Sequence, residues 1–364
     1  MQVELVAYNP PNQTSGIGRY YRELFQNLKD RVDIRMAFPR FPPLSDRFTI
    51  LRNFPLGILN HQPGSIVHFT QIMGCAQMLW YPVHPAIATV HDLGMLAWPP
   101  EANMFRAMDR LLVHLSILGL KRMDFIVAVS RYTRQTVIQQ LKFPAERVRT
   151  AYPGHDNQLF RPIVSARERL AARYPQLADS KHKYLLYVGS ELPRKNLATL
   201  LEAVSLLPSN VRLVKIGPSG GARFRADTKE LMTRYKLEDR VLFFEQVPES
   251  ELPLFYSAAD VYVCASLLEG FGLPIVESMA CRTPIVCSNV ASLPEVAGNA
   301  AALVPPADAH AFAEAISQVL SDETLHAEMA SAGLRRAAAF TWEKTADAVA
   351  AVYDDVIRSD RKHR

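Results

Sequence analysis

The stretches Val261-Tyr-Val-Cys-Ala265 and Glu269-Gly-Phe-Gly-Leu-Pro-Ile-Val-Glu277 decide the fold that this 364-residue sequence predicts. The first is a continuous apolar run of strand length, which is typical of a strand buried on both faces. The second begins with two closely spaced glycines and continues into a helical pattern that includes Val276, Met279 and Ala280. A buried strand, a tight turn and a helix in this order form the repeating unit of a parallel α/β sheet.

Similar strand–helix units recur on both sides of this stretch, in two series. Short apolar strands are expected at residues 3–7, 66–69, 87–90, 125–129, 184–188, 211–216, 241–244, 261–264, 284–287 and 301–304. Helical patterns lie between successive strands, as at residues 16–29, 103–120 and 131–141. This alternation predicts two doubly wound, Rossmann-like α/β domains. Because open parallel sheets bind ligands outside the carboxyl ends of their strands, we expect the two domains to face each other across a cleft.

The chain length agrees with two domains, at roughly 150 residues per domain. We place the first domain at residues 1–165 and the second at residues 180–339. The segment from Pro153 to Ser180 has mixed charges and little periodicity, so it is interpreted as the linker. Residues 340–364 have the pattern of an amphipathic helix, which we expect to cross back to the first domain.

The composition excludes several classes of protein. Hydrophobic residues make up 49% and charged residues 21%, which is not the composition of a disordered or collagen-like chain. The 41 Lys and Arg residues exceed the 36 Asp and Glu residues by only 5, so we expect no nucleic-acid partner. The four cysteines form no C-x-x-C pair, and no apolar run is long enough to span a membrane. The sequence therefore predicts a cytoplasmic protein with reduced cysteines.

Positive charge is concentrated in the first half of the chain. Residues 1–180 contain 21 basic and 13 acidic residues, or +8, whereas the remainder contains 20 and 23, or −3. This asymmetry indicates either an anionic partner, such as phosphate groups or an acidic lipid surface, or simply a solvated basic face. The expected helix at 103–120 carries Arg106 and Arg110, and Lys121 and Arg122 follow it. Both a peripheral contact with an anionic membrane and plain packing on the sheet fit this pattern.

The glycine-rich turn before Glu277 is the first candidate ligand site. Gly270 and Gly272 let the backbone approach a ligand closely, and the amides that begin the following helix favour an anion such as a phosphate. Glu277 can accept hydrogen bonds from two vicinal hydroxyls, as in a ribose, and Glu269 would face a second group of hydroxyls. The structural alternative is a turn flanked by two solvated carboxylates.

A second candidate phosphate site lies at Gly189-Ser-Glu-Leu-Pro-Arg-Lys-Asn196, also between a strand and a helix. Arg194 and Lys195 are adjacent cations beside a helix start for which Asn196 is the expected N-cap. A diphosphate would meet both positive charge and amide donors there. A solvated Arg-Lys pair is the alternative.

Two further motifs lie in the first domain. In Ser15-Gly-Ile-Gly-Arg19, Gly16 and Gly18 permit close backbone approach, and Arg19 projects from the first helical turn. This loop lacks the third glycine and the acidic residue of a nicotinamide-dinucleotide site, so it is either a ligand loop or a tight turn.

His91 and Asp92 follow a strand of the first domain. His91 could donate to a hydroxyl or carbonyl, and Asp92 could orient His91 or cap the next segment. The alternative is that His91 has only a structural role. No second His or Cys lies at metal-ligand spacing from His91, so no metal site is expected.

With these motifs, the chain resembles the retaining glycosyltransferase family 4, whose members have the GT-B fold. The family's main mark is a pair of glutamates separated by seven residues, which Glu269 and Glu277 match. Further matches are Ala258-Ala-Asp-Val-Tyr-Val263, Pro284-Ile-Val286, Ser292-Leu-Pro-Glu-Val296, Gly16-Ile-Gly-Arg19, His91-Asp92 and Val129-Ser130. The resemblance therefore covers nearly the whole chain.

The resemblance implies a nucleotide-sugar donor, held mainly by the second domain, and neither an essential metal nor a cofactor. It implies that Glu277 binds the ribose of the donor and that Glu269 binds its sugar. The backbone of Gly270, Phe271, Gly272 and Leu273 would bind the diphosphate. Gly16 and Gly18 of the first domain would also contact the donor. Arg194 and Lys195 would neutralise the negative charge of the departing diphosphate, and His91 would contact the reacting centre. These three residues and Glu269 are the expected catalytic residues. Arg19 and Asp92 would face the acceptor. Many members have an arginine where this chain has Ser190, which leaves open whether Arg194 replaces its charge.

The Pro-Arg-Lys-Asn loop and the Ser-Gly-Ile-Gly-Arg start are similar to those of bacterial enzymes that transfer mannose during O-antigen or exopolysaccharide assembly. By this resemblance we expect GDP-mannose as donor, a saccharide or lipid-linked saccharide as acceptor, and retention of configuration. The alternatives are a nucleotide-sugar epimerase or hydrolase on the same fold, and a non-catalytic interaction protein.

Overall fold

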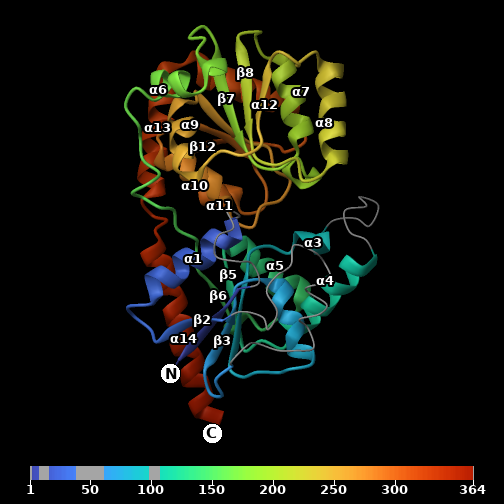
Figure 1. The fold of residues 1–364 in the computed structure, drawn as a ribbon, viewed down its shortest axis with the longest axis vertical. Coiled ribbons are helices and arrows are strands. Elements are labelled where there is room, and N and C mark those ends of the chain that lie inside the picture. The colour runs from blue at the N-terminus through green and yellow to red at the C-terminus, as the bar shows by residue number, and fades with distance from the viewer. Residues whose placement is uncertain (1, 8–15, 38–60, 98–106, 364) are drawn as a thin grey trace. The chain divides into compact units, whose positions relative to one another are not determined.

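The computed structural model describes residues 2–7, 16–37, 61–97 and 107–363 of the chain (Figure 1). The chain divides into two compact units, which we call unit 1 (residues 1–154 with 342–364) and unit 2 (residues 155–341). Each unit contains a six-stranded parallel sheet with helices on both faces (Figure 1). The prediction of two doubly wound domains is therefore confirmed.

The sheet of unit 1 has the strand order β2-β1-β3-β4-β5-β6. Its strands are β1 (Val3–Val6), β2 (Ile34–Ala37), β3 (Ile66–Phe69), β4 (Ala86–Val90), β5 (Phe125–Ala128) and β6 (Val148–Thr150). Its helices are α1 (Gly16–Leu28), η2 (Ile72–Leu79), α3 (Gly94–Ala97), α4 (Ala107–Leu120), α5 (Arg131–Leu141), η4 (Ala145–Arg147) and α14 (Trp342–His363). The edge strands β2 and β6 were not predicted from the sequence, because an arginine interrupts each of them and they are only partly buried.

The sheet of unit 2 has the order β12-β11-β10-β7-β8-β9. Its strands are β7 (Lys183–Val188), β8 (Val211–Ile216), β9 (Val241–Phe244), β10 (Val261–Cys264), β11 (Ile285–Ser288) and β12 (Ala301–Val304). Its helices are α6 (Ala166–Arg173), η5 (Pro175–Leu177), η6 (Pro193–Lys195), α7 (Leu197–Leu206), α8 (Ala222–Tyr235), η7 (Glu249–Glu251), α9 (Leu252–Ala258), α10 (Leu273–Ala280), α11 (Leu293–Ala297), α12 (Ala309–Ser321) and α13 (Glu323–Ala337).

The strand order of unit 2 reverses between β7 and β10. The chain builds the sheet outward from β7 through β8 to β9, and then from β10 through β11 to β12 on the other side. Ligands of open α/β sheets bind at the carboxyl ends of the strands that flank such a reversal. The loops that follow β7 and β10 are therefore the expected ligand loops of this unit.

The interpretation of residues 153–180 as a linker is wrong. This segment contains α6, which packs against α9, and Arg167 of α6 donates hydrogen bonds to the carbonyl oxygens of Ala258 and His182. Only Ala166 and Leu170 of α6 are buried, which left too weak a pattern to be recognised as a helix. Unit 2 accordingly begins at residue 155, and unit 1 regains the chain at α14.

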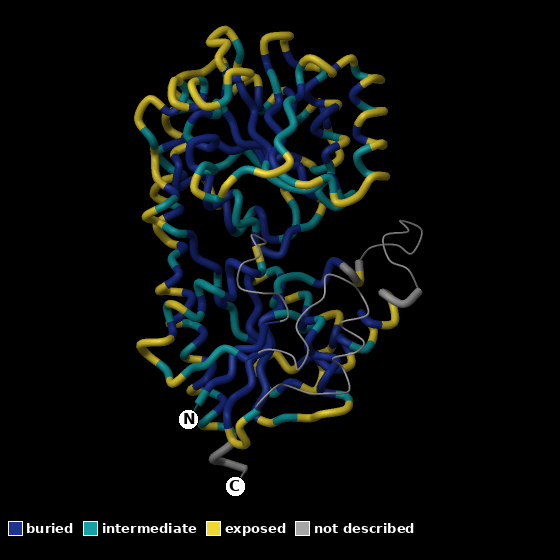
Figure 2. Tube along the Cα trace, in the orientation of Figure 1, coloured by how far each residue is buried: buried dark blue, intermediate teal, exposed yellow. Residues whose placement is uncertain are grey.

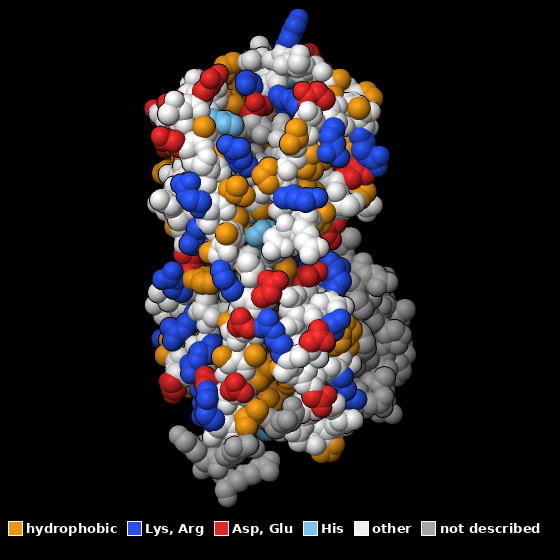
Figure 3. Space-filling model, turned by 90° about the vertical axis from the view of Figure 1, so that its left-hand side faces the viewer, with side chains coloured by type: hydrophobic (Ala, Val, Ile, Leu, Met, Phe, Trp, Pro, Cys, Tyr) orange, Lys and Arg blue, Asp and Glu red, His pale blue; other side chains and the backbone are white. Residues whose placement is uncertain are grey.

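In unit 1, α14 packs against α1, and Arg31 forms an ion pair with Asp347. The strands of both units are buried, and exposed positions lie on the outer sides of the helices and in loops (Figure 2). Basic and acidic side chains are interspersed over the face drawn in Figure 3. All four cysteines are buried and unbonded to one another. Among the described residues, none of the helices combines the length and the apolar character needed to cross a membrane.

Candidate active site

The two loops that flank the strand-order reversal of unit 2 are hydrogen-bonded to each other. The backbone amide of Leu267, after β10, donates to the carbonyl of Arg194, after β7, over 2.8 Å. Asn196 donates its side-chain amide to the carbonyls of Ala265 and Pro306. Asn196 stands at the expected start of α7, but in a left-handed conformation without a side-chain cap to the helix. Its side chain therefore joins the loops.

Gly272 sets the angle at which α10 leaves the second loop. It has a φ of 97°, which L side chains rarely adopt, and an added Cβ would lie 3.2 Å from the Leu293 side chain. The buried hydroxyl of Ser292 donates to the carbonyls of Glu269 and Phe271, which fixes the turn before this glycine. The start of α10 is thus held rigidly beside Glu269.

Glu269 lies at the centre of a buried charge cluster. Its Oε1 accepts hydrogen bonds from Lys195 Nζ over 2.5 Å and from Ser266 Oγ over 2.7 Å. Arg194 lies 3.6 Å from its Oε2. Burial raises the pKa of Glu269, but Lys195 and Arg194 outweigh it, so the carboxyl's pKa is lower than usual. The structure thus brings together three of the predicted site residues, as two cations around one carboxylate.

Glu277 lies on the second turn of α10 and is almost fully buried. Its Oε2 accepts a hydrogen bond of 2.9 Å from the hydroxyl of Tyr256 in α9. Tyr256 packs edge-on against Phe160 and Tyr262, and burial raises its pKa well above the usual value, so it stays a donor. Tyr256 was not predicted from the sequence, because it stands in an apolar run typical of core residues.

A second ion network, which was not predicted from the sequence, anchors the loop after β7. Glu191 is buried, and its Oε1 lies 3.0 Å from Nζ of the fully buried Lys215 and 2.6 Å from the Arg225 guanidinium. Arg225 also pairs with Glu245 at 2.9 Å. Burial by itself raises the pKa of the Glu191 carboxyl, but the hydrogen bonds from Arg225 and Lys215 lower it by more. The pKa of Glu191 therefore lies below its usual value. A lysine inside the apolar strand at 211–216 was the available signal.

In unit 1, His91 follows β4 and lies beside α1. Its Nε2 is 3.0 Å from the carbonyl oxygen of Thr70, and its ring stands edge-on to Tyr20 at 4.8 Å. Burial lowers the pKa of His91, and the neighbouring Thr70 and Asp92 only partly offset this. Because a carbonyl only accepts, the neutral ring carries its proton on Nε2. The sequence suggested that His91 donates a hydrogen bond to the ligand. Because Nε2–H already donates to Thr70, the nitrogen left for a ligand is Nδ1, which accepts.

The other predicted residues of unit 1 have specific places as well. Asp92 Oδ1 accepts a hydrogen bond from the amide of Gly94, the first residue of α3, as expected for a residue that caps the following segment. Gly16 and Gly18 lie within the first turn of α1, and the preceding residues 8–15 are outside the described part of the chain. Arg19 does not project from this turn; only 9% of it is exposed. Tyr20 in the next position joins this motif to His91.

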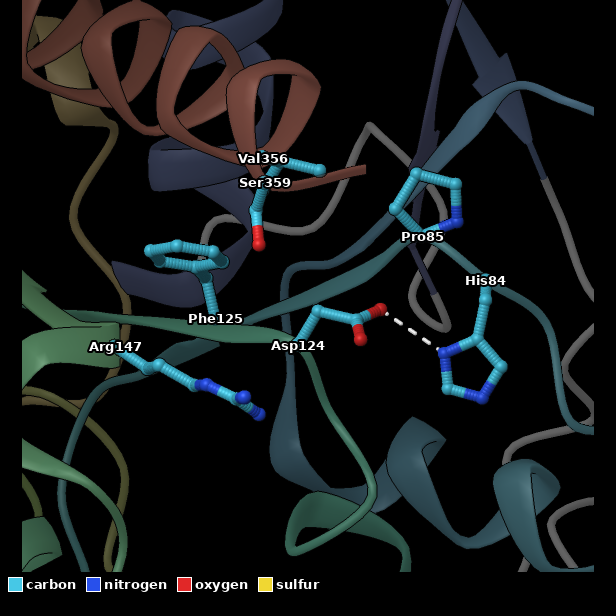
Figure 4. A pocket seen from close by; sticks show the side chains of 7 residues that line it. All are labelled: His84, Pro85, Asp124, Phe125, Arg147, Val356 and Ser359. Carbon is cyan, nitrogen blue, oxygen red and sulfur yellow. Dashed lines mark hydrogen bonds and ion pairs between the residues drawn. The ribbon is translucent and has the colours of Figure 1, made fainter. Parts of the chain in front are cut away.

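A pocket of unit 1 lies elsewhere. It is lined by His84, Pro85, Asp124, Phe125, Arg147, Val356 and Ser359 (Figure 4). Most of these residues precede β4, β5 and β6, so the pocket lies at the amino ends of the strands, opposite the edge that carries His91. His84 and Asp124 pair within it at 3.0 Å. Within the described residues, no group of three or more His, Cys, Asp or Glu side chains is arranged to hold a metal ion.

Two doubly wound sheets, with two buried carboxylates at a strand-order reversal beside paired cations, define a glycosyltransferase of the GT-B class. The family described as Glycosyl transferases group 1 matches residues 169–336, and Glycosyltransferase Family 4 matches residues 22–159. The chain therefore belongs to glycosyltransferase family 4, with a group 1 glycosyl transferase domain in its second half.

Relatives and solved structures agree with this assignment. The chain is 34% identical over 262 residues to O-antigen chain mannosyltransferase B from Escherichia coli, over 71% of this chain and 67% of the relative. Sucrose-phosphate synthase from Thermosynechococcus elongatus superposes with a TM-score of 0.79 at 23% identity, over 98% of this chain and 99% of that one. HepE from Anabaena, solved with UDP-glucose, has a TM-score of 0.77 at 16% identity, over 98% and 100% of the two chains. The expected fold and the expected enzyme class are confirmed.

Proposed function

We propose that this glycosyltransferase transfers mannose from GDP-mannose to a saccharide or lipid-linked saccharide during assembly of a cell-surface polysaccharide, with retention of configuration. The relative named O-antigen chain mannosyltransferase B supports mannose as the transferred sugar and a polysaccharide as the product. The observation that carries the proposal is the cluster of Arg194, Lys195 and Glu269 beside the start of α10.

The donor would lie along the two ligand loops of unit 2. Glu277, oriented by Tyr256, would accept hydrogen bonds from the ribose hydroxyls. The backbone of residues 270–273 would contact the diphosphate, since this turn leads into the amino end of α10, where the helix dipole favours an anion. Glu269 would bind hydroxyls of the sugar, and Arg194 and Lys195 would stabilise the charge that grows on the departing diphosphate.

The chemical step would need no metal ion and no cofactor. The acceptor hydroxyl would attack from the face that the diphosphate leaves, and a diphosphate oxygen would take the hydroxyl proton. His91 Nδ1 would accept a hydrogen bond from a hydroxyl of the transferred sugar, and Gly16 and Gly18 would approach the donor. Arg19 and Asp92 would lie on the acceptor side.

The donor assignment is tested by thermal shift with GDP, UDP, ADP and GDP-mannose, because a ligand that binds only the folded state raises its melting temperature. We expect GDP and GDP-mannose to stabilise the wild type but to have little effect on Glu277→Gln. Stabilisation by UDP alone would refute the GDP assignment. Rapid release of mannose without an acceptor would indicate a hydrolase, and a β-linked product would contradict retention.

We also propose a peripheral contact with an anionic membrane, through a surface formed by α4 and the end of η2. Leu111 and Leu118 on the outer face of α4 are 48% and 39% exposed. Arg122, just after α4, donates to the carbonyls of Met78 and Leu79, which places its charge beside the exposed Trp80 and Tyr81. Aromatic rings next to cations suit a lipid interface.

In the structure, the membrane proposal rests on different residues from those that suggested it in the sequence. Arg106 lies outside the described residues, and Leu112 is buried in the core rather than facing outward. We expect cosedimentation with anionic vesicles that is lost at high salt, and lost on combining Lys121→Gln and Arg122→Gln with Trp80→Ala. The matched control is Lys181→Gln with Lys229→Gln, two exposed cations of unit 2. Equal binding of the control and the surface variant would refute the proposed surface.

A further inference from the structure

His68 of β3 is a fully buried histidine that the proposed reaction does not use. Its Nδ1 lies 2.7 Å from the hydroxyl of Tyr353 in α14, and its Nε2 lies 2.8 Å from Oγ1 of Thr89 in β4. Burial lowers the pKa of His68 to about 3. The ring is therefore neutral at pH 7, with one nitrogen donating and the other accepting.

The hydrogen-bonded chain continues from Thr89 toward the candidate site. Thr89 Oγ1 is 3.4 Å from the hydroxyl of Tyr20, and the Tyr20 ring stands edge-on to His91 at 4.8 Å. Tyr20 also contacts Trp342, at a ring separation of 5.8 Å. Contacts thus run without a break from α14 through the core of unit 1 to His91.

We propose that Tyr353, His68 and Thr89 are positioning residues that hold Tyr20, and through it the imidazole of His91. This inference rests on the role proposed above for His91. Burying an imidazole and three hydroxyls is costly unless each finds a partner, and the chain of contacts provides those partners. It also attaches His91 to α14, which begins directly after the last residue of unit 2.

Tyr21 is the natural contrast to Tyr20. Both rings are almost fully buried on neighbouring positions of α1. The Tyr21 hydroxyl, however, has no hydrogen-bond partner among the described residues. Burial raises the pKa of Tyr20 to about 12, so its hydroxyl stays protonated and can take part in the chain. Tyr21→Phe therefore removes an equally buried hydroxyl without touching the network.

The test uses Tyr353→Phe and Thr89→Val in the full-length protein, because both keep the shape of the side chain. In protein labelled with ¹⁵N-histidine, we expect the pKa of His91 to rise toward its ordinary value of 6.5, since looser packing admits water. Asp92 and His68 are the titratable neighbours whose charges also act on this ring, and Tyr20 faces it. We expect kcat to fall about five- to tenfold, a loss equivalent to one hydrogen bond, with the donor KM within twofold.

The outcomes separate this inference from the proposed function. If Tyr353→Phe and Thr89→Val leave the His91 resonances and kcat unchanged, as expected for Tyr21→Phe, the positioning role is refuted. If kcat and KM change alike in all three variants, a general loss of stability explains the result and the inference is also refuted. If the His91 pKa responds but His91→Ala is fully active, the proposed function of His91 fails while the positioning of its ring stands.

Discussion

Replacing Lys195 by methionine should destabilise unit 2 in a way that depends on pH. The substitution keeps the apolar stem but leaves the buried Glu269 without its closest cation. Breaking a buried ion pair by removing one partner typically costs 3–5 kcal/mol. Because Arg194 at 3.6 Å and the hydroxyl of Ser266 remain, we expect about 3 kcal/mol at pH 7, at the lower end of that range.

The sign of the pH dependence follows from the lowered pKa of Glu269. In the folded protein this pKa lies below its ordinary value of 4.5, so the ionised carboxylate favours folding above that pH. The contribution is lost as the pH falls through the lowered folded-state value. The difference between wild type and Lys195→Met should therefore be largest near pH 7 and shrink below pH 4.5.

Differential scanning calorimetry at pH 7 and pH 4 measures this effect. For a unit of this size, 1 kcal/mol corresponds to roughly 2–4 °C, so the transition of unit 2 should fall by about 6–12 °C at pH 7. Lys229→Met, at an exposed position of α8, is the control and should change little. An equal loss at both pH values would refute the reasoning, as would strictly additive effects of Lys195→Met and Glu269→Gln in a double-mutant cycle.

Further predictions concern binding and turnover. Lys195→Ala should lower kcat more than it raises the donor KM, because charge grows on the leaving diphosphate; a raised KM with intact kcat would mean that Lys195 only binds. Glu277→Gln should weaken GDP binding by about 1.5–3 kcal/mol, measured by calorimetric titration, and Tyr256→Phe by less; unchanged affinity in a folded variant would contradict the ribose assignment. Activity should persist in EDTA, whereas a loss that Mg²⁺ restores would refute the metal-free proposal.

The sequence alone was sufficient for the fold class and for all the described strands except β2 and β6. The bounds of β9, β10 and β12 coincide with those predicted, because these runs are continuously apolar. The edge strands β2 and β6 of unit 1 were missed because Arg35 and Arg149 interrupt their apolar runs, which an edge strand tolerates since one side of it faces solvent. The edge strands β9 and β12 of unit 2 contain no charged residue and were recognised. The glutamates at 269 and 277 were recognisable because their spacing is local in the sequence.

Which residues meet was decided only by the tertiary structure. Lys195 and Glu269 are 74 positions apart, and they pair because the strand order places β7 beside β10. His68 and Tyr353 are 285 positions apart, and no local pattern links them. Periodicity reports which face of an element is buried, but not what is buried against it. The partners of Glu277, Glu191 and His91 therefore became known only once the chain was folded, because long-range packing and not sequence spacing brings those groups within hydrogen-bonding distance.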